Sequence, residues 1–154
     1  MTALKSLLYL LVVQNFGFYI PLAFCRGGAR VNTGALAYLA FIMWPLGILG
    51  VLWCFWDFTY RGRGTPLPTD PPKELVVSGL YQHVRNPIYV SVITILMGHF
   101  VWFGSLALLV YTGLAFVGTH LFVTLYEEPA LRKRFGGTYD EYLTKVPRWI
   151  PTFK

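Results

Sequence analysis

The sequence predicts an all-α integral membrane protein with about four transmembrane helices. Apolar residues make up 55% of the 154 residues and charged residues only 13%, whereas soluble domains have about 25% charged residues. The apolar residues gather in four stretches, which segments containing Pro, Gly or charged residues separate. A chain of this length is expected to form one domain, 1–154.

Three of the apolar stretches are long enough to span a bilayer, which takes about 20 residues. They cover about 4–24, 34–58 and 104–126. The remaining stretch is shorter and directly precedes the last, so we expect these two to form a helical hairpin with its turn at Gly98, His99 and Gly104. The predicted parts are two N-terminal spans in 1–58, a cytoplasmic loop in 59–87, the hairpin in 88–126 and a cytoplasmic tail in 127–154.

The distribution of Lys and Arg predicts the orientation. Four spans place the N-terminus, the long loop and the tail on one side of the membrane, with eleven basic residues there and only Arg26 and Arg30 opposite. The positive-inside rule then puts both termini on the cytoplasmic side of the membrane. We expect this membrane to be a bacterial inner membrane or a plasma membrane. The net charge of +6 is expected to face anionic lipid headgroups of the bilayer. We expect no nucleic-acid partner, because no RNA-binding signature or basic helix is present.

The long loop and the tail contain turn and helix signals, so we expect them to be more than simple connectors. The loop is rich in Pro and Gly, which favours extended segments and turns, and loops of this length are usually functional or disordered. In the tail, "EEPALRKRF" predicts a helix that ends at Gly136 and Gly137. "TYDE" predicts a capping box, with Thr138 and Glu141 at the start of a helix over 139–146.

Polar residues cluster where the hairpin meets the loop and the tail. Arg85 and Asn86 precede the third apolar stretch, and Glu127 and Glu128 follow the fourth. The two ends of a hairpin are adjacent, so we expect Arg85 to pair with a glutamate, which lowers the cost of holding either charge near hydrocarbon.

Helical spacing places further residues of the hairpin on shared faces. On the fourth stretch these are Gly113, His120, Thr124 and Glu127, and on the third they are Pro87, Ser91, Thr94 and Gly98. The small residues among them predict close helix packing. His120 is open to two interpretations, a packing residue or part of a site above the glutamates. Cys25 and Cys54 lack ligand spacing, so neither a disulfide framework nor a metal site is expected.

Two segments together resemble a known family. "LVVSGLYQHVRNPIY" and "EEPALRKRFGGTYDEYLTKVPRWIP" resemble the isoprenylcysteine carboxyl methyltransferase family and the related phospholipid methyltransferases. These are small integral membrane enzymes that use S-adenosylmethionine. The resemblance covers about residues 62–151, and it rests on the composite of both segments rather than on R-N-P alone.

The resemblance implies roles for individual residues. Arg85 and Glu127 are the implied catalytic or orienting residues, and Glu127 is also a cofactor contact. The other implied contacts of S-adenosylmethionine are Lys73, Glu74, Leu75, Val76, Tyr81, Asn86, Pro87, Ile88 and Tyr89. The chemistry agrees with such a ligand, because glutamate suits its amino group and tyrosine faces attract its sulfonium.

Two departures from the family pattern concern the methyl acceptor. Asn86 stands where many eukaryotic prenylcysteine enzymes have histidine, and Val123 stands where they have an arginine linked to the substrate. Asparagine retains hydrogen bonding but has no basic nitrogen. The predicted function is therefore methyl transfer to a lipophilic or small acceptor through oxygen, nitrogen or sulfur, and the oligomeric state stays open.

Two alternatives from other classes are retained. The first is an NADPH-dependent membrane reductase, because sterol reductases have a related C-terminal half. The second is a non-enzymatic membrane subunit whose polar junctions are only structural.

Overall fold

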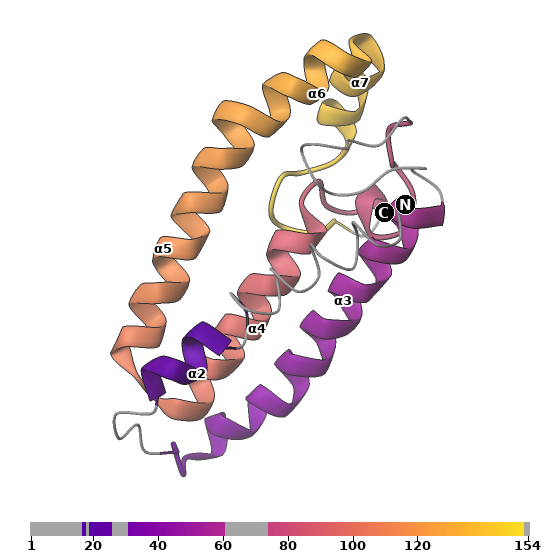
Figure 1. Cartoon of the computed structure of the whole chain (residues 1–154). Helices are drawn as coiled ribbons and strands as arrows, with labels where there is room; N and C mark the ends of the chain where they lie inside the picture. The colour runs from indigo at the N-terminus through magenta and orange to yellow at the C-terminus, as the bar shows by residue number, and fades with distance from the viewer. Residues whose placement is uncertain (1–16, 18, 26–30, 61–73, 153–154) are drawn as a thin grey trace.

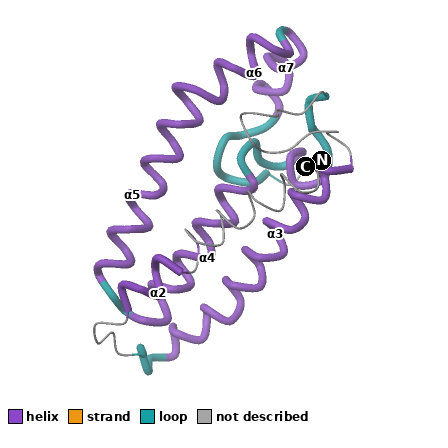
Figure 2. Tube along the Cα trace, in the orientation of Figure 1, coloured by secondary structure: helices purple, strands orange, loops and turns teal. Residues whose placement is uncertain are grey.

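The computed structural model describes residues 17, 19–25, 31–60 and 74–152, and this part of the chain is α-helical without any strand (Figure 2). The α-helices are α2 (Ile20–Cys25), α3 (Ala40–Tyr60), α4 (Pro87–Phe103), α5 (Leu106–Phe122), α6 (Glu128–Phe135) and α7 (Gly137–Lys145). Two 3-10 turns, η2 (Ala35–Leu39) and η3 (Gly79–Gln82), and a π-helical turn, η4 (Val123–Glu127), complete the elements. The predicted all-α class is confirmed. Most of the first predicted span lies outside the described residues.

Two continuous helical segments are long and apolar enough to cross a membrane, Ala35–Phe58 and Leu106–Phe135, while Pro87–Phe103 is shorter. Their large apolar side chains are mostly exposed, as Leu46 (63% exposed) and Leu114 (67% exposed) illustrate. The core helix of a soluble protein buries such side chains. An apolar helix that exposes them on most sides fits lipid as its surroundings.

α3 and α4 pack closely because small residues line their contact. A side chain at Gly47 would meet the backbone oxygen of Ser91, and one at Gly50 would meet the Ser91 hydroxyl. Further along, Gly98 faces the Trp44 ring. Ser91 and Gly98 therefore lie at a close helix contact as predicted, but the partner helix is α3 and not α5. The predicted close packing at Gly113 is wrong, because a side chain there would meet nothing within 4 Å among the described residues. Small residues at such contacts let helix backbones come together.

α4 and α5 form the predicted helix–turn–helix, and α4 lies between α3 and α5 (Figure 1). The turn is at Gly104, whose φ of +59° favours glycine. The prediction that Gly98 and His99 mark this turn is wrong, because both are buried inside α4. α5 buries only Leu108 and Thr112, near the turn, and then leans away from α4 (Figure 1).

The helices of the tail gather at the end of the bundle where α3 ends and α4 begins, which we call the polar end (Figure 1). Tyr139, Tyr142 and Val146 form a small core there, against which Leu75 packs. The predicted tail helices are present, but the capping box is wrong. The residue before α7 is Gly136, with no side-chain cap, and Glu141 binds Lys145 one turn later.

Candidate functional site

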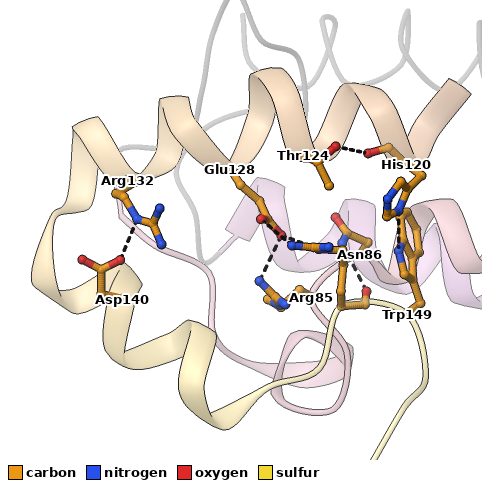
Figure 3. A network of polar contacts seen from close by, with 9 residues as sticks. Arg85, Asn86, His120, Thr124, Glu128, Arg132, Asp140 and Trp149 are labelled. Atoms are coloured by element: carbon orange, nitrogen blue, oxygen red, sulfur yellow. Dashed lines mark hydrogen bonds and ion pairs between the residues drawn. The ribbon is translucent and has the colours of Figure 1, made fainter.

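An ion cluster joins three separate segments at the polar end (Figure 3). The Glu128 carboxylate accepts a hydrogen bond from Arg85 Nη1 (2.9 Å to Oε1). It also accepts two from Arg148, through Nε (2.8 Å to Oε1) and Nη2 (2.9 Å to Oε2). Two-point pairing of this kind is the strongest form of arginine–carboxylate contact. The predicted pairing of Arg85 with a glutamate is confirmed, and the glutamate is Glu128.

The C-terminal strap, residues 147–152, runs along the start of α4. The Arg85 backbone N–H donates to the Pro147 carbonyl oxygen at 2.9 Å. The Asn86 amide nitrogen donates to the Arg148 carbonyl oxygen at 3.1 Å. At its far end, the Thr152 N–H donates to the His83 carbonyl oxygen at 3.1 Å. The strap therefore closes over residues 83–86, and Asn86 serves the strap rather than capping α4 with its side chain.

Glu127 has different partners from its neighbour Glu128. Its Oε2 accepts a hydrogen bond from the Tyr89 hydroxyl at 3.1 Å. Its other oxygen, Oε1, has no hydrogen-bond partner among the described residues. Glu127 ends the π-helical turn η4, and single π turns within α-helices occur frequently at functional sites. The extra residue of this turn changes which side chains share a helix face, so the simple spacing from Gly113 to Glu127 does not hold.

Tyr81 connects this region to the bundle core. Its ring packs among Cys54, Val76 and Ile88, and its carbonyl oxygen accepts a hydrogen bond from the Tyr142 hydroxyl at 2.7 Å. Burial raises the pKa of the Tyr81 hydroxyl well above its usual range, and the nearby negative charge of Glu127 adds to this effect. The hydroxyl therefore stays protonated and neutral in this apolar setting.

Gly79 fixes the loop that carries Tyr81. Its φ is +62°, a conformation that glycine adopts without strain. An added side chain would also collide with the carboxylate of Asp57, which is fully buried on α3, and with the Trp53 ring. The loop approaches α3 this closely only because the residue is glycine.

His120 and Trp149 form a second link between the strap and α5. Trp149 Nε1 donates a hydrogen bond to His120 Nδ1 at 3.1 Å (Figure 3). Phe116 packs against the Trp149 ring, with 5.2 Å between ring centroids. His120 and Trp149 lie further along the helix toward α5 than Glu128 and Arg85 do (Figure 3).

The predicted site residues differ in their surroundings. Lys73 lies outside the described residues. Glu74 is exposed, while Leu75 packs against the tail helices. The predicted site residues that lie in or beside the bundle core are Val76, Tyr81, Asn86, Pro87 and Ile88. The predicted site residues that have polar partners across the hairpin are Arg85, Tyr89 and Glu127. The structure thus brings Arg85, Tyr89 and Glu127 to the same end of the hairpin, and their predicted roles stay predictions.

The sequence-based site omitted Glu128, Arg148 and Trp149. The sequence indicates Glu128 as a possible partner of Arg85 but does not indicate that it is the centre of an ion cluster. Arg148 and Trp149 lie in "VPRWIP", where two prolines favour an extended segment. A charged and an aromatic residue between two prolines indicate that this segment could contribute to a site. They do not indicate which helix the segment contacts.

The comparisons with known proteins agree with this arrangement. A family model described as phospholipid methyltransferase matches residues 35–138, which is more than half of the chain. The match begins at η2 and ends within α7, so it includes the α3–α4 pair, η4 and both glutamates. No individual relative matches the chain among curated proteins. The chain belongs to the phospholipid methyltransferase family, a family of membrane methyltransferases.

Proposed function

We propose that this protein uses S-adenosylmethionine to methylate a lipophilic or small acceptor at the membrane. One observation carries the proposal. Glu127 holds, beside Tyr89 at the polar end of an apolar helix bundle, a carboxylate oxygen that has no partner within the described part of the chain. Membership of a methyltransferase family supplies the reaction class.

The residues at the polar end fit this cofactor chemically. The open Glu127 oxygen can accept a hydrogen bond from a primary ammonium group. The rings of Tyr81 and Tyr89 supply aromatic faces, which attract cations such as a sulfonium. Asn86 uses its amide nitrogen on the strap, and its amide oxygen has no partner among the described residues. When bound, S-adenosylmethionine would supply a methyl group activated by the positive charge on sulfur.

The protein's own contribution is positioning and exclusion of water. Arg85 and Arg148 are held by Glu128, so the strap is fixed against the start of α4. The strap contacts both Asn86 at the start of α4 and His120 on α5, so it helps to hold together the two helix ends that carry Tyr89 and Glu127. A lipophilic acceptor would reach these two side chains along the apolar helices. Holding two reactants in a defined orientation can account for several kcal/mol of a reaction barrier. We place this end in the cytoplasm, where the cofactor is made.

Neither alternative class is favoured. The family match supports methyl transfer, which is not the chemistry of an NADPH-dependent reductase. A purely structural subunit has no need of a partly buried carboxylate that uses one oxygen on a tyrosine hydroxyl and leaves the other without a partner among the residues described. Thermal stabilisation by NADPH, without any response to S-adenosylhomocysteine, would reverse this preference.

Calorimetry of the detergent-purified protein tests cofactor binding. S-Adenosylmethionine and S-adenosylhomocysteine should both bind. Glu127→Gln removes a charge-assisted hydrogen bond of about 1.5–3 kcal/mol, so affinity should fall by about 10-fold to 100-fold. Asp140→Asn is the matched control, because its pair among the described residues is with the exposed Arg132. Absence of binding at millimolar ligand would refute the proposal.

Transfer of a radiolabelled methyl group in native membranes tests the reaction itself. The labelled product identifies the acceptor and shows whether oxygen, nitrogen or sulfur is methylated. A protein that binds the cofactor but labels no membrane component or added lipid would be a binding protein rather than an enzyme.

A further inference from the structure

We propose that His120 binds an oxygen atom of the methyl acceptor through its Nε2–H group, and that Trp149 sets the ring for this task. The inference rests on the proposed methyl transfer and deepens it by naming an acceptor-binding residue. The acceptor it implies is a lipid that carries a carboxylate or phosphate oxygen near the atom to be methylated.

The hydrogen bond between the two rings fixes the tautomer of His120. The indole Nε1–H of Trp149 can only donate, and it lies 3.1 Å from His120 Nδ1. Nδ1 must therefore be the unprotonated, accepting nitrogen. In the neutral ring the remaining proton is then on Nε2. Trp149 thus turns His120 into a hydrogen-bond donor at Nε2.

The ring is also held in place. The ring centroid of Trp149 lies 5.9 Å from that of His120. The ring centroid of Phe116, one helical turn before His120, lies 6.3 Å from it. Trp149 itself is in the strap, next to Arg148, which Glu128 binds at two points. The position of the Nε2–H group is therefore linked to the ion cluster.

The Nε2–H group has no hydrogen-bond partner in the described part of the chain. His120 is only partly buried, yet it lies on a helix that is apolar enough to cross a membrane. A donor without a partner in apolar surroundings costs free energy that a ligand oxygen would recover. A packing histidine such as His99 instead uses its own helix, through the Ile95 carbonyl oxygen.

The place of His120 along α5 indicates which ligand meets it. Glu127 and Glu128 follow at the polar end, while the exposed residues that precede His120, such as Val117 and Leu114, are apolar. A lipid with its chain along α5 would therefore bring its polar group to His120 before that group reaches Glu127. A neutral N–H donor matches a carboxylate or phosphate oxygen.

Nuclear magnetic resonance of the full chain, labelled with ¹⁵N-histidine in dodecyl maltoside micelles, tests the assignment directly. The chain has three histidines, so the variants His83→Gln and His99→Gln identify the His120 signals. We expect His120 to be protonated at Nε2 and not at Nδ1. Trp149→Phe should allow both tautomers. A wild-type ring protonated at Nδ1 would overturn the proposal.

Three twelve-carbon probes then distinguish the acceptor chemistry: laurate, dodecyl phosphate and dodecanethiol. Laurate or dodecyl phosphate should shift the His120 Nε2 resonance, and whichever acts at lower concentration identifies carboxylate or phosphate as the preferred group. Dodecanethiol has no such oxygen and should leave the resonance unchanged. Equal shifts with all three probes, or no shift with either anion, would overturn the proposal.

Kinetics with the acceptor identified by radiolabelling give a second readout. His120→Phe should raise the KM for the acceptor by about 10-fold to 100-fold, while calorimetric affinity for S-adenosylmethionine stays unchanged. His120→Gln keeps an N–H donor and should recover part of the loss. Unchanged acceptor KM in His120→Phe overturns this inference alone. Failure of the wild-type protein to bind S-adenosylmethionine overturns the proposed function and this inference with it.

Discussion

The α3–α4 pair and α5 are joined to the rest of the protein by different forces. α3 and α4 touch along their length through Gly47, Gly50 and Gly98, where no side chain fits. α5 has glycines too, but a side chain added at Gly113 would meet nothing within 4 Å. Beyond the first turns of α5, its links within the described residues are mainly polar contacts at or just after its far end, those of His120, Glu127 and Glu128.

The α3–α4 pair therefore serves as the scaffold, while the end of α5 belongs to the candidate site. Close packing of small residues fixes α4, and with it Tyr89, relative to α3. The end of α5 is positioned instead by charge pairs and hydrogen bonds, which act at the same place as the proposed cofactor contacts. Changes to the first region should therefore act on folding, and changes to the second should act on both stability and ligand binding.

The largest effect should come from filling the contact of α3 and α4. Gly47→Val would place a Cβ atom 2.6 Å from the Ser91 backbone oxygen and 2.5 Å from Ile95 Cγ1, so the helices must separate. We expect a loss of about 3 kcal/mol in the free energy of unfolding, because overpacking of a closely packed contact costs this much. Unfolding by SDS in mixed micelles measures it.

Gly113→Ala is the matched control, because Gly113 lies in a helix of the same hairpin but has open space around it. Here alanine should stabilise the protein by about 0.5–1 kcal/mol, the usual gain in a helix interior. If Gly113→Ala destabilised the protein as strongly as Gly47→Val, α5 would be packed in a way that contradicts the comparison.

The next largest effect should come from the ion cluster. Glu128→Gln leaves Arg85 and Arg148 without their anion, and the side chains of Arg85 and Glu128 are only 14% and 15% exposed. Breaking a partly buried pair should cost about 2 kcal/mol, between the values for buried and exposed pairs. The strap should also loosen, so trypsin should cleave after Arg148 faster than in the wild type. Asp140→Asn, which removes an exposed pair with Arg132, should change neither quantity measurably.

A smaller effect is expected where the tail helix meets the loop. Burial and the neighbouring Tyr139 raise the pKa of the Tyr142 hydroxyl, so it stays protonated and donates to the Tyr81 carbonyl oxygen. Tyr142→Phe removes this bond and should cost about 1 kcal/mol. Tyr139→Phe is the control, because the Tyr139 hydroxyl has no hydrogen-bond partner among the described residues. Equal losses in both variants would show that the hydrogen bond to the Tyr81 carbonyl oxygen adds no specific stability.

The fold class and the helices of the hairpin were predictable from sequence, because apolar stretches and turn residues act locally. The start of α4 at Pro87 and the turn at Gly104 follow from residue chemistry alone. The assignment of Gly98 and His99 to the turn failed because neither residue shows in sequence that Trp44 of another helix covers it.

The site was predictable only in part, for the same reason. The hairpin brings the start of α4 next to the end of α5, so the pairing of Arg85 with a glutamate could be inferred. The choice between Glu127 and Glu128 could not, because η4 alters the helical phase just before them. The role of Arg148 and Trp149 depends on the path of the strap, which results from tertiary contacts and not from local preference.

The smallest effect tests the corrected start of α7. The sequence pattern predicts that Thr138 caps the helix, and removal of a cap costs about 1 kcal/mol. In the structure Gly136 precedes the helix without a side-chain cap, and its φ of +55° redirects the chain. Glu141 is occupied by Lys145, whose ammonium lowers the pKa of the Glu141 carboxyl. Thr138→Ala should therefore leave the unfolding transition in SDS unchanged. A loss near the value for a cap would mean that Thr138 and Glu141 form the predicted capping box, and that Lys145 is not the main partner of Glu141.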